Sequence, residues 1–295
     1  MIGIDWGTTS FRAWRMAPDG TILDRTGSDR GILAIPPGGF PEALRGAIAP
    51  WLAAGERLVL LCGMVGSRQG WQEAPYLTCP AGPAEIAATL TPLDFEGARC
   101  LLVPGLSTRD SANVPDVMRG EETKLIGMLA EVGDAPAVAC LPGTHAKWAR
   151  LGDRQVQGFT THMTGEVRAV LLEHSILGRL AAAGPFDEAA FLRGVGRARD
   201  GAGLLHHLFG TRALGLMGEL APEATDSYLS GLLIGHEVNA AMAGGGAAEG
   251  PIHLAGSAAL TRAYGLAFDA FGLEHRLHDP DIALRGLALI GETLA

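Results

Sequence analysis

Two short turns rich in glycine and hydroxyl side chains are the parts of this sequence whose residue types could do chemistry. The first, Asp5-Trp6-Gly7-Thr8-Thr9-Ser10, directly follows an apolar stretch. Successive backbone N–H groups in such a turn can converge on one point and bind an anion, and the hydroxyls of Thr8 and Thr9 add donors. Asp5 would face the same space and could hold a magnesium ion directly or through water. Alone, such a turn is more often an ordinary hairpin.

The second turn, Leu141-Pro142-Gly143-Thr144-His145, occupies the same place in a second run of similar pattern. Two anion-binding turns that face each other across a cleft between domains would suit a nucleotide polyphosphate. His145 could donate a hydrogen bond to a phosphate oxygen or assist at the transferring group. The alternative is a histidine with a purely structural place in the turn.

The elements that must position the first turn follow the order of a ribonuclease-H-like domain. Three strands form an antiparallel meander, and alternating helices and strands follow, which a mixed sheet covered by helices would satisfy. The expected elements are strands at Ile2–Trp6, Phe11–Met16 and Thr21–Arg25, a helix at Phe40–Ala54, a strand at Arg57–Cys62, a helix at Ala84–Leu90 and a strand at Cys100–Val103.

An internal repeat places the second turn in a second domain of the same kind. The expected elements are a helix at Glu121–Glu131, strands at Ala137–Pro142, Lys147–Leu151 and Gln155–Phe159, helices at Glu166–Leu180 and Asp226–Ala243, and a strand at Ile252–Ala255. We therefore predict an α/β protein of two ribonuclease-H-like lobes with mixed sheets and a nucleotide cleft between them. The predicted lobes are residues 1–115, with the first phosphate hairpin, and 116–295, with the second.

Composition excludes several classes of partner. The chain has 295 residues and a formal net charge of −9, without a run of lysine or arginine, which argues against nucleic acid or an anionic membrane as the main partner. The four cysteines follow no metal or redox spacing, so we expect buried, reduced thiols. The sequence has no leader-like start and no membrane-spanning stretch, which favours a cytoplasmic protein that acts on a small molecule.

Several longer motifs carry a resemblance to a known family. They are "IDWGTTSFRAW", "GMVGSRQGW", "APYL", "VMRGEETKLIG", "LPGTHAKW", "MTGE" and "SGLLIGHEV", and together they extend over nearly the whole chain. In this order they resemble the 2-dehydro-3-deoxygalactonokinases, within the superfamily of sugar kinases, heat-shock chaperones and actin. The resemblance implies an actin-like ATPase fold and the use of ATP with Mg²⁺.

The resemblance also assigns the nucleotide contacts. Asp5 would hold the metal, and the two hairpins would bind phosphate groups. The segment Ile252-His253-Leu254-Ala255-Gly256-Ser257 is similar in form and order to the adenosine motif of the superfamily. Gly256 would permit close approach of the nucleoside. The residues expected to bind ATP are Gly7, Thr8, Thr9, Gly143, Thr144, His145, Gly256 and Ser257.

Related kinases place an acidic residue as general base at the start of the helix that corresponds to Glu121–Glu131. Glu121 is the candidate and Glu122 the close competitor, although the usual base of the superfamily is aspartate. A carboxylate here would accept the proton of the attacking hydroxyl and orient that hydroxyl toward the γ-phosphate. Alternatively, both glutamates only complement the positive end of a helix dipole.

The resemblance further implies a loop that contacts the sugar, with glycines that let the backbone approach and a tryptophan that covers the ligand. The expected contacts from this loop are Met64, Gly66, Ser67, Arg68 and Trp71. A sugar acid also needs a partner for its carboxylate, and the forked guanidinium of arginine matches two oxygens. Arg119, Arg68 and Arg12 are the candidates, and the position of Arg119 beside a motif favours it.

The implied function is phosphorylation of the C6 hydroxyl of 2-dehydro-3-deoxy-D-galactonate by ATP. Another 2-keto-3-deoxy sugar acid or a sugar is the alternative substrate, and a non-catalytic ATP-binding regulatory protein is the alternative class. A DNA-binding repressor of this fold would need a helix-turn-helix segment, for which the sequence gives no pattern. A homodimer is compatible with the sequence.

Overall fold

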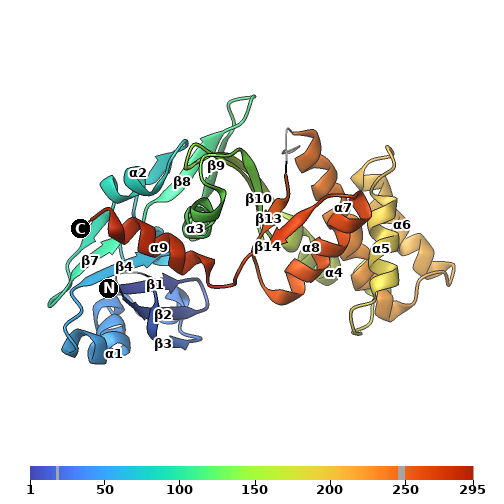
Figure 1. Cartoon of the computed structure of the whole chain (residues 1–295). Helices are drawn as coiled ribbons and strands as arrows, with labels where there is room; N and C mark the ends of the chain where they lie inside the picture. The colour runs from blue at the N-terminus through green and yellow to red at the C-terminus, as the bar shows by residue number, and fades with distance from the viewer. Residues whose placement is uncertain (18–19, 245–249, 295) are drawn as a thin grey trace. The chain divides into compact units, whose positions relative to one another are not determined.

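The computed structural model describes residues 1–17, 20–244 and 250–294 and divides the chain into two compact units (Figure 1). Unit 1 comprises Met1–Pro136, Leu151–Phe159 and Asp279–Ala295, and unit 2 comprises Ala137–Arg150 and Thr160–His278. None of the helices in the described ranges is long and apolar enough to cross a membrane.

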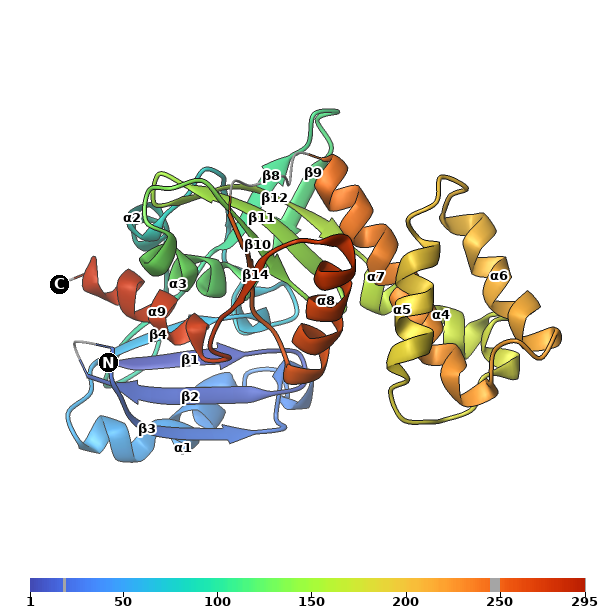
Figure 2. The same cartoon turned by 45° about the vertical axis from the view of Figure 1, so that its right-hand side comes forward.

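Unit 1 is built on a six-stranded sheet of order β3-β2-β1-β4-β7-β6. The meander β1 to β3, whose strands lie side by side in Figure 2, is antiparallel, whereas β4 and β7 continue the sheet in parallel with β1. The strands are β1 (Ile2–Trp6), β2 (Phe11–Met16), β3 (Ile22–Ser28), β4 (Leu58–Cys62), β6 (Thr91–Leu93) and β7 (Arg99–Leu102). Because parallel strands end at one edge, the segments after β1 and β4 meet there.

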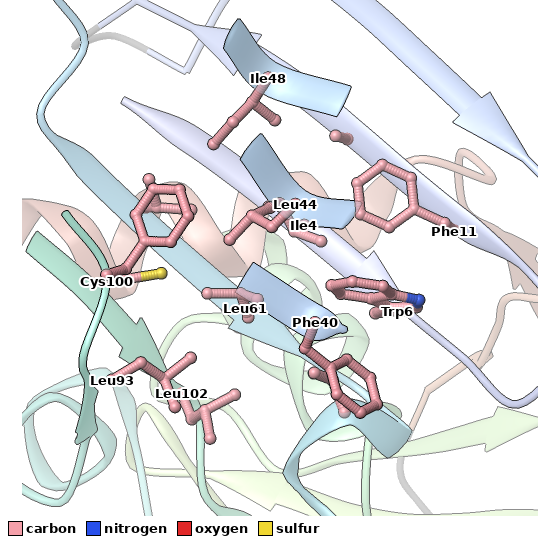
Figure 3. Packing of buried hydrophobic residues seen from close by; sticks show 14 of the residues in the cluster. Ile4, Trp6, Phe11, Phe40, Leu44, Ile48, Leu61, Leu93, Cys100 and Leu102 are labelled. Atoms are coloured by element: carbon pink, nitrogen blue, oxygen red, sulfur yellow. The ribbon is translucent and has the colours of Figure 1, made fainter. Parts of the chain in front are cut away.

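The main core of unit 1 lies between this sheet and helix α1 (Phe40–Ala53). Figure 3 shows side chains of β1, β4 and α1 packed together, with the Trp6 ring beside Phe11 and Phe40. The Trp6 centroid lies 4.9 Å from that of Phe11 and 5.3 Å from that of Phe40, both in edge-to-face arrangement. This packing fixes the end of β1, from which the first turn departs.

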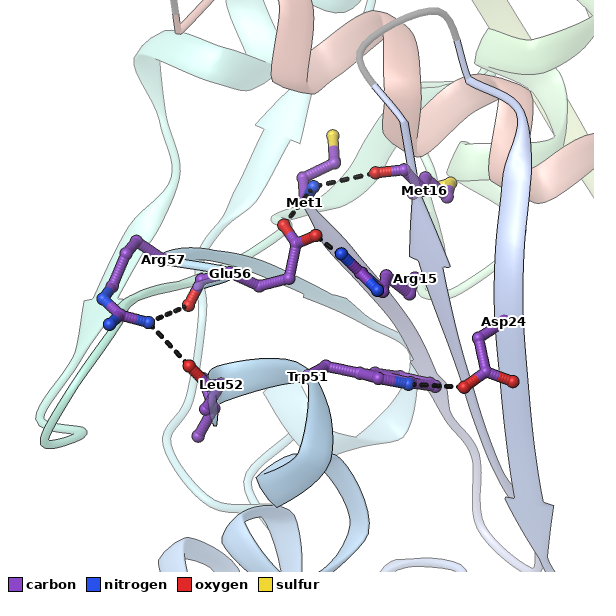
Figure 4. Close-up of polar contacts among 8 residues, drawn as sticks. All are labelled: Met1, Arg15, Met16, Asp24, Trp51, Leu52, Glu56 and Arg57. Atoms are coloured by element: carbon purple, nitrogen blue, oxygen red, sulfur yellow. Dashed lines mark hydrogen bonds and ion pairs between the residues drawn. The ribbon is translucent and has the colours of Figure 1, made fainter. Parts of the chain in front are cut away.

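Polar contacts tie the opposite end of the meander to β4 and α1 (Figure 4). The Glu56 carboxylate accepts from the Met1 amino group at 2.7 Å and from Arg15 Nε at 2.8 Å. Trp51 Nε1 donates to Asp24 Oδ2 at 2.8 Å. Burial alone would raise the pKa of Glu56, but its two cationic partners bring the pKa below its usual range. The ionised carboxylate therefore joins β1, β2 and β4.

Helices α3 (Glu122–Val132) and α9 (Ile282–Glu292) pack closely in unit 1, and glycines make this possible. A Cβ at Gly286 would lie 1.9 Å from the Thr123 carbonyl oxygen, and one at Gly127 would lie 2.1 Å from that of Ile282. Residues 116–136 and the C-terminal helix therefore belong to unit 1, which differs from the division predicted at residue 115.

Unit 1 also contains elements that the sequence did not predict. A three-stranded sheet of order β5-β8-β9 comprises β5 (Tyr76–Thr78), β8 (Gly105–Arg109) and β9 (Pro115–Met118). Helix α2 (Pro83–Ala88) packs against α9. The prediction that all four cysteines are buried is wrong for Cys79, which is partly exposed after the short strand β5, whereas Cys62, Cys100 and Cys140 are buried.

The second sheet has the order β12-β11-β10-β13-β14, which repeats the order β3-β2-β1-β4-β7 of unit 1. The predicted internal repeat is thereby confirmed. Its strands are β10 (Ala137–Leu141), β11 (Ala146–Gly152), β12 (Gln155–His162), β13 (Ile252–Leu254) and β14 (His275–Leu277). Strands β10 and β13 are parallel, so the second turn and the segment after β13 leave the same edge.

The helices of unit 2 are α4 (Thr164–His174), α5 (Glu188–Arg197), α6 (Leu204–Leu216), α7 (Thr225–Ala243) and α8 (Ala258–Phe271). The buried Glu237 of α7 accepts from Trp148 Nε1 and from the Tyr264 hydroxyl, each at 2.7 Å, which links α7 to β11 and α8. The predicted helix at Glu166–Leu180 is wrong in extent, because Ser175 is extended and its hydroxyl accepts from the Leu177 N–H.

Candidate active site

Backbone hydrogen bonds close the first turn, and the segment at Ile32 and Leu33 supports it. The Gly7 N–H donates to the Ser10 carbonyl at 2.9 Å. The carbonyls of Gly7 and Thr8 accept from Ile32 and Leu33 at 3.0 and 3.3 Å. Thr8 and Thr9 are exposed at the tip. The turn is therefore held in one shape with its hydroxyl residues toward solvent, as an anion site would require.

Asp5 lies at the carboxyl end of β1, opposite Cys62 in the parallel register with β4. Gly63 follows β4 with φ of 92°, and a Cβ there would lie 3.1 Å from Asp5 Oδ1. Gly120 has φ of 103°, and its Cβ would lie 3.2 Å from the Gly63 Cα. These two left-handed glycines bring the segment before α3 against the end of β1.

Charged groups from β2 and α3 surround the Asp5 carboxylate. Burial raises the pKa of Asp5, the charges of Lys124 and Arg12 oppose this rise, and Glu121 adds to it. Glu121 is the N-cap residue of α3. The structure thus brings Asp5, Arg12 and Glu121 into one electrostatic neighbourhood of unit 1.

Glu122 has a different environment from Glu121. Its side chain is fully buried, and its Oε2 accepts the Gly120 N–H at 2.5 Å. Its Oε1 has no hydrogen-bond partner within the described residues. Burial, with a further contribution from the neighbouring Glu121 charge, raises the pKa of Glu122 to about 8. Glu122 is therefore neutral at pH 7 and fixes the segment that precedes α3.

Arg119 is buried, with 9% of its surface exposed, and only part of its guanidinium is satisfied. Nη2 donates to the Ala74 carbonyl at 2.7 Å, and the guanidinium carbon lies 4.5 Å from the ring centroid of Tyr76. In the described part of the chain, Nε and Nη1 have no acceptor. A buried cation with two unsatisfied donors is costly unless an anion completes it.

The segment after β4 folds as a compact loop beside Arg119. A 3-10 turn at Met64–Gly66 begins it, and the Trp71 N–H returns to the Val65 carbonyl at 2.9 Å. A Cβ at Gly66 would lie 3.0 Å from Arg119 Nη1. Glycine here therefore leaves space beside the unsatisfied guanidinium.

The other predicted residues of this loop make contacts with other groups. The Ser67 hydroxyl donates to the Met64 carbonyl at 2.7 Å and so stabilises the loop itself. The Trp71 ring stacks on Phe40 at 6.2 Å and joins the core cluster. The Arg68 side chain is 87% exposed and pairs with Glu73 at 2.9 Å. Of the three candidate arginines, only Arg119 is buried, since Arg12 is also exposed.

In unit 2 the second turn is bound closely to the start of α4. The Glu166 N–H donates to the Thr144 carbonyl at 3.0 Å. A Cβ at Gly165 would lie 2.6 Å from the Gly143 carbonyl oxygen, so only glycine fits. His145 Nε2 contacts Glu166 Oε2, and both side chains are about half exposed. Glu166 belongs to the motif "MTGE" but was not among the predicted site residues.

The predicted adenosine motif lies beside the second turn. The Ala255 N–H donates to the Cys140 carbonyl at 3.2 Å, which aligns the ends of β13 and β10. A Cβ at Gly256 would lie 3.6 Å from the Pro142 carbonyl oxygen. Ser257 is exposed and occupies the N-cap position of α8. Unit 2 thus presents Gly143–His145 and Gly256–Ser257 at one edge of its sheet.

Comparison with known proteins identifies the group of enzymes to which these features correspond. The family model for 2-keto-3-deoxy-galactonokinase matches residues 5–290. The chain belongs to this family. The probable 2-dehydro-3-deoxygalactonokinase of Rhizobium meliloti strain 1021 is 41% identical over 286 residues, covering 96% of this chain and 93% of the relative. The 2-dehydro-3-deoxygalactonokinase of Escherichia coli K12 is 37% identical over 273 residues, covering 92% and 90%.

Solved structures agree with the family and with the fold. The crystal structure of a candidate 2-dehydro-3-deoxygalactonokinase from Sinorhizobium meliloti matches with a TM-score of 0.90 and 39% identity, covering 99% of this chain and 97% of that chain. The activator of 2-hydroxyisocaproyl-CoA dehydratase from Clostridium difficile, with bound ADPNP, matches with a TM-score of 0.52 at 10% identity, covering 100% and 95%, which shows the fold alone. The predicted family, fold class and phosphotransferase class are confirmed.

Proposed function

We propose that this member of the 2-keto-3-deoxy-galactonokinase family uses ATP to phosphorylate 2-dehydro-3-deoxy-D-galactonate on its C6 hydroxyl. The observation that carries the choice of an acid substrate is the buried Arg119 guanidinium with two unsatisfied N–H donors. A charged carboxylate is a stronger acceptor for an arginine N–H than a neutral hydroxyl is. The carboxylate of the sugar acid would supply an acceptor for one of these donors and a counter-charge for the buried guanidinium.

In the proposed reaction the C6 oxygen attacks the γ-phosphorus, the bond from that phosphorus to the β–γ bridging oxygen breaks, and ADP leaves. The proton of the hydroxyl passes to Glu121, which orients the hydroxyl in line with the breaking bond. Glu121 suits this role better than Glu122, because Glu122 is fully buried and holds its own proton at pH 7. Both carboxylates belong to unit 1.

The residues present fit a magnesium ion bound together with ATP. Magnesium usually takes one or two protein carboxylates and completes its octahedron with phosphate oxygens and water. Asp5 supplies such a carboxylate, and no cluster of three or more metal-binding side chains occurs in the ranges that the structure describes. When bound, the ion would neutralise developing negative charge on the phosphate oxygens. Asp5 would hold it and keep its position relative to the first turn.

For ATP itself, the proposed contacts are the turn at Gly7–Thr9, the turn at Gly143–His145 and the nucleoside contact at Gly256–Ser257. Their support is the shared placement at the carboxyl edges of the two sheets, where α/β proteins bind ligands. ATP and sugar-acid intermediates are cytoplasmic metabolites, so we propose that the enzyme works in the cytoplasm.

Replacing Arg119 tests the proposed function. We expect Arg119→Gln to lower kcat/KM for the sugar acid by about a hundredfold, mainly through KM, because one partner of a buried charge pair is lost. A neutral analogue, in which the C1 carboxylate is an amide, should be a poor substrate for the wild type. Arg119→Gln should lower kcat/KM for this analogue only slightly further. Steady-state kinetics with both compounds measures this.

Arg68→Gln provides the comparison, because Arg68 is the rival arginine and is already paired on the surface. We expect its kcat/KM to stay within about twofold of the wild type. A large loss in Arg68→Gln with normal kinetics in Arg119→Gln would assign the carboxylate to Arg68. Equal activity of the wild type on the acid and on the amide would contradict the proposed substrate class.

A further inference from the structure

We propose that Glu166 is a positioning residue for phosphate binding, which acts by holding the imidazole of His145 in one orientation within the second turn. The inference rests on the proposed function of that turn. The carrying observation is the direct contact between Glu166 Oε2 and His145 Nε2. No role was predicted for Glu166 from the sequence motifs.

Backbone contacts fix Glu166 relative to the turn and so keep its carboxylate within hydrogen-bond reach of His145. The Glu166 N–H donates to the Thr144 carbonyl at 3.0 Å, and Gly165 lies against the Gly143 carbonyl with no room for a Cβ. The Lys147 ammonium donates to the His145 carbonyl at 3.0 Å and so also holds the backbone of the turn. The side-chain pair is thus built onto two rigidly joined backbones.

Helix α4 is attached by partly buried apolar side chains, which pack on the cluster of Leu177, Leu229 and Leu233, and by a polar contact. Arg168 makes a two-bond contact with Asp226 of α7, with Nε at 2.7 Å from Oδ1 and Nη2 in contact with Oδ2. Bidentate pairs of this kind fix orientation as well as distance. The attachment keeps the first turn of α4, and Glu166 with it, at the second turn.

The contact between His145 and Glu166 leaves one ring nitrogen of His145 for a phosphate group. Nε2 donates its proton to the Glu166 carboxylate, and within residues 1–17, 20–244 and 250–294 no other side chain hydrogen-bonds the ring, which leaves Nδ1 for a ligand. A phosphate oxygen can only accept, so Nδ1 would carry a proton when it donates to one. Glu166 would therefore fix the ring with Nδ1 available to the ligand.

A double-mutant cycle with Glu166→Gln, His145→Ala and the double variant tests this proposal. Glutamine keeps the shape and the hydrogen-bond acceptor but removes the charge. We expect Glu166→Gln to lower kcat/KM for ATP by about tenfold, because a hydrogen bond to a carboxylate is stronger than one to a neutral amide oxygen. In the His145→Ala background the same change should have an effect below about twofold, because Glu166 acts through His145.

The matched control is Glu173→Gln, which removes a glutamate of the same helix that also pairs with a histidine, His174, at 3.6 Å on the surface. Its kinetics should equal those of the wild type. Unchanged kinetics in Glu166→Gln, or an equal loss with and without His145, would overturn the proposal.

A second measurement does not depend on turnover. The ¹⁵N spectrum of the His145 ring in the protein without nucleotide should show a protonated Nε2, and Glu166→Gln should shift it while Glu173→Gln should not. Absence of this shift would overturn the proposal even in an active kinase. Conversely, a clear shift in a protein that fails to phosphorylate the sugar acid would leave the pair intact and reject the proposed function instead.

Discussion

Glu121→Gln is expected to lower kcat by about a hundredfold to ten-thousandfold while the affinity for ATP changes little, the range of a positioned acid–base group. Glutamine at the N-cap of α3 keeps the size of the side chain but cannot accept the proton of the sugar hydroxyl. Orientation of the hydroxyl in line with the breaking bond contributes part of this effect. Single-turnover kinetics and nucleotide titration measure the two quantities separately.

Glu122→Gln is the matched control, one residue along the chain. The amide oxygen can still accept the Gly120 N–H, so the segment before α3 should keep its shape and kcat should fall by less than about tenfold. If the large loss occurs in Glu122→Gln and Glu121→Gln stays active, the base is Glu122.

The same variant should change how stability depends on pH. Folded Glu122 keeps its proton up to about pH 8, whereas the unfolded residue releases it near its ordinary pKa of 4.5. Between these values the folded state binds more protons, so the contribution of Glu122 to the free energy of unfolding falls as pH rises. Glu122→Gln removes this fall, which is at most about 5 kcal/mol. Denaturant unfolding at pH 5 and pH 8 measures this. From pH 5 to pH 8 the free energy of unfolding of the variant should rise relative to that of the wild type.

Asp5→Asn is the second change with a large expected effect. We expect kcat to fall by about a thousandfold, because placement of magnesium at the phosphates supplies several kcal/mol of charge stabilisation. The fold should persist, since the raised pKa of Asp5 shows that burial of this carboxylate opposes ionisation. The melting temperature, compared with that of the wild type, checks this.

Two further outcomes separate a metal-binding role of Asp5 from a structural one. The variant should need a higher magnesium concentration for half-maximal rate, and near-normal turnover at saturating magnesium would contradict the role. As pH falls, protons should compete with magnesium for Asp5, so the magnesium concentration for half-maximal rate should rise in the wild type. Asp5→Asn should lack this rise.

Local patterns predicted the strands and turns that recur in both sheets. Alternating or continuous apolar runs that end in Gly-Thr located β1 and β10, and the similar run near residue 252 located β13. Strands β5, β6 and β14 have three residues each and lack a continuous apolar run such as the one near residue 252. The association of the C-terminal helix with α3 depends on glycine contacts between residues far apart in sequence, which no local pattern indicates.

The candidate site shows the same limit. From the sequence, Arg119, Arg68 and Arg12 were equal candidates for binding the carboxylate apart from the motif beside Arg119. Burial distinguishes Arg119 from the two exposed arginines. It could not separate the neighbours Glu121 and Glu122 either, because their difference is that Glu122 lies wholly inside the protein. Glu166 was missed although its motif was noted, since its partner is in another segment.

The position of the phosphate group on the product tests the central claim most directly. Wild-type protein incubated with ATP, Mg²⁺ and 2-dehydro-3-deoxy-D-galactonate should form ADP and a phosphorylated acid in equal amounts. In ¹³C and ³¹P NMR spectra of the product, the C6 signal should be split by coupling to one phosphorus. ADP without a phosphorylated acid, or coupling at a carbon that does not adjoin C6, would contradict the account.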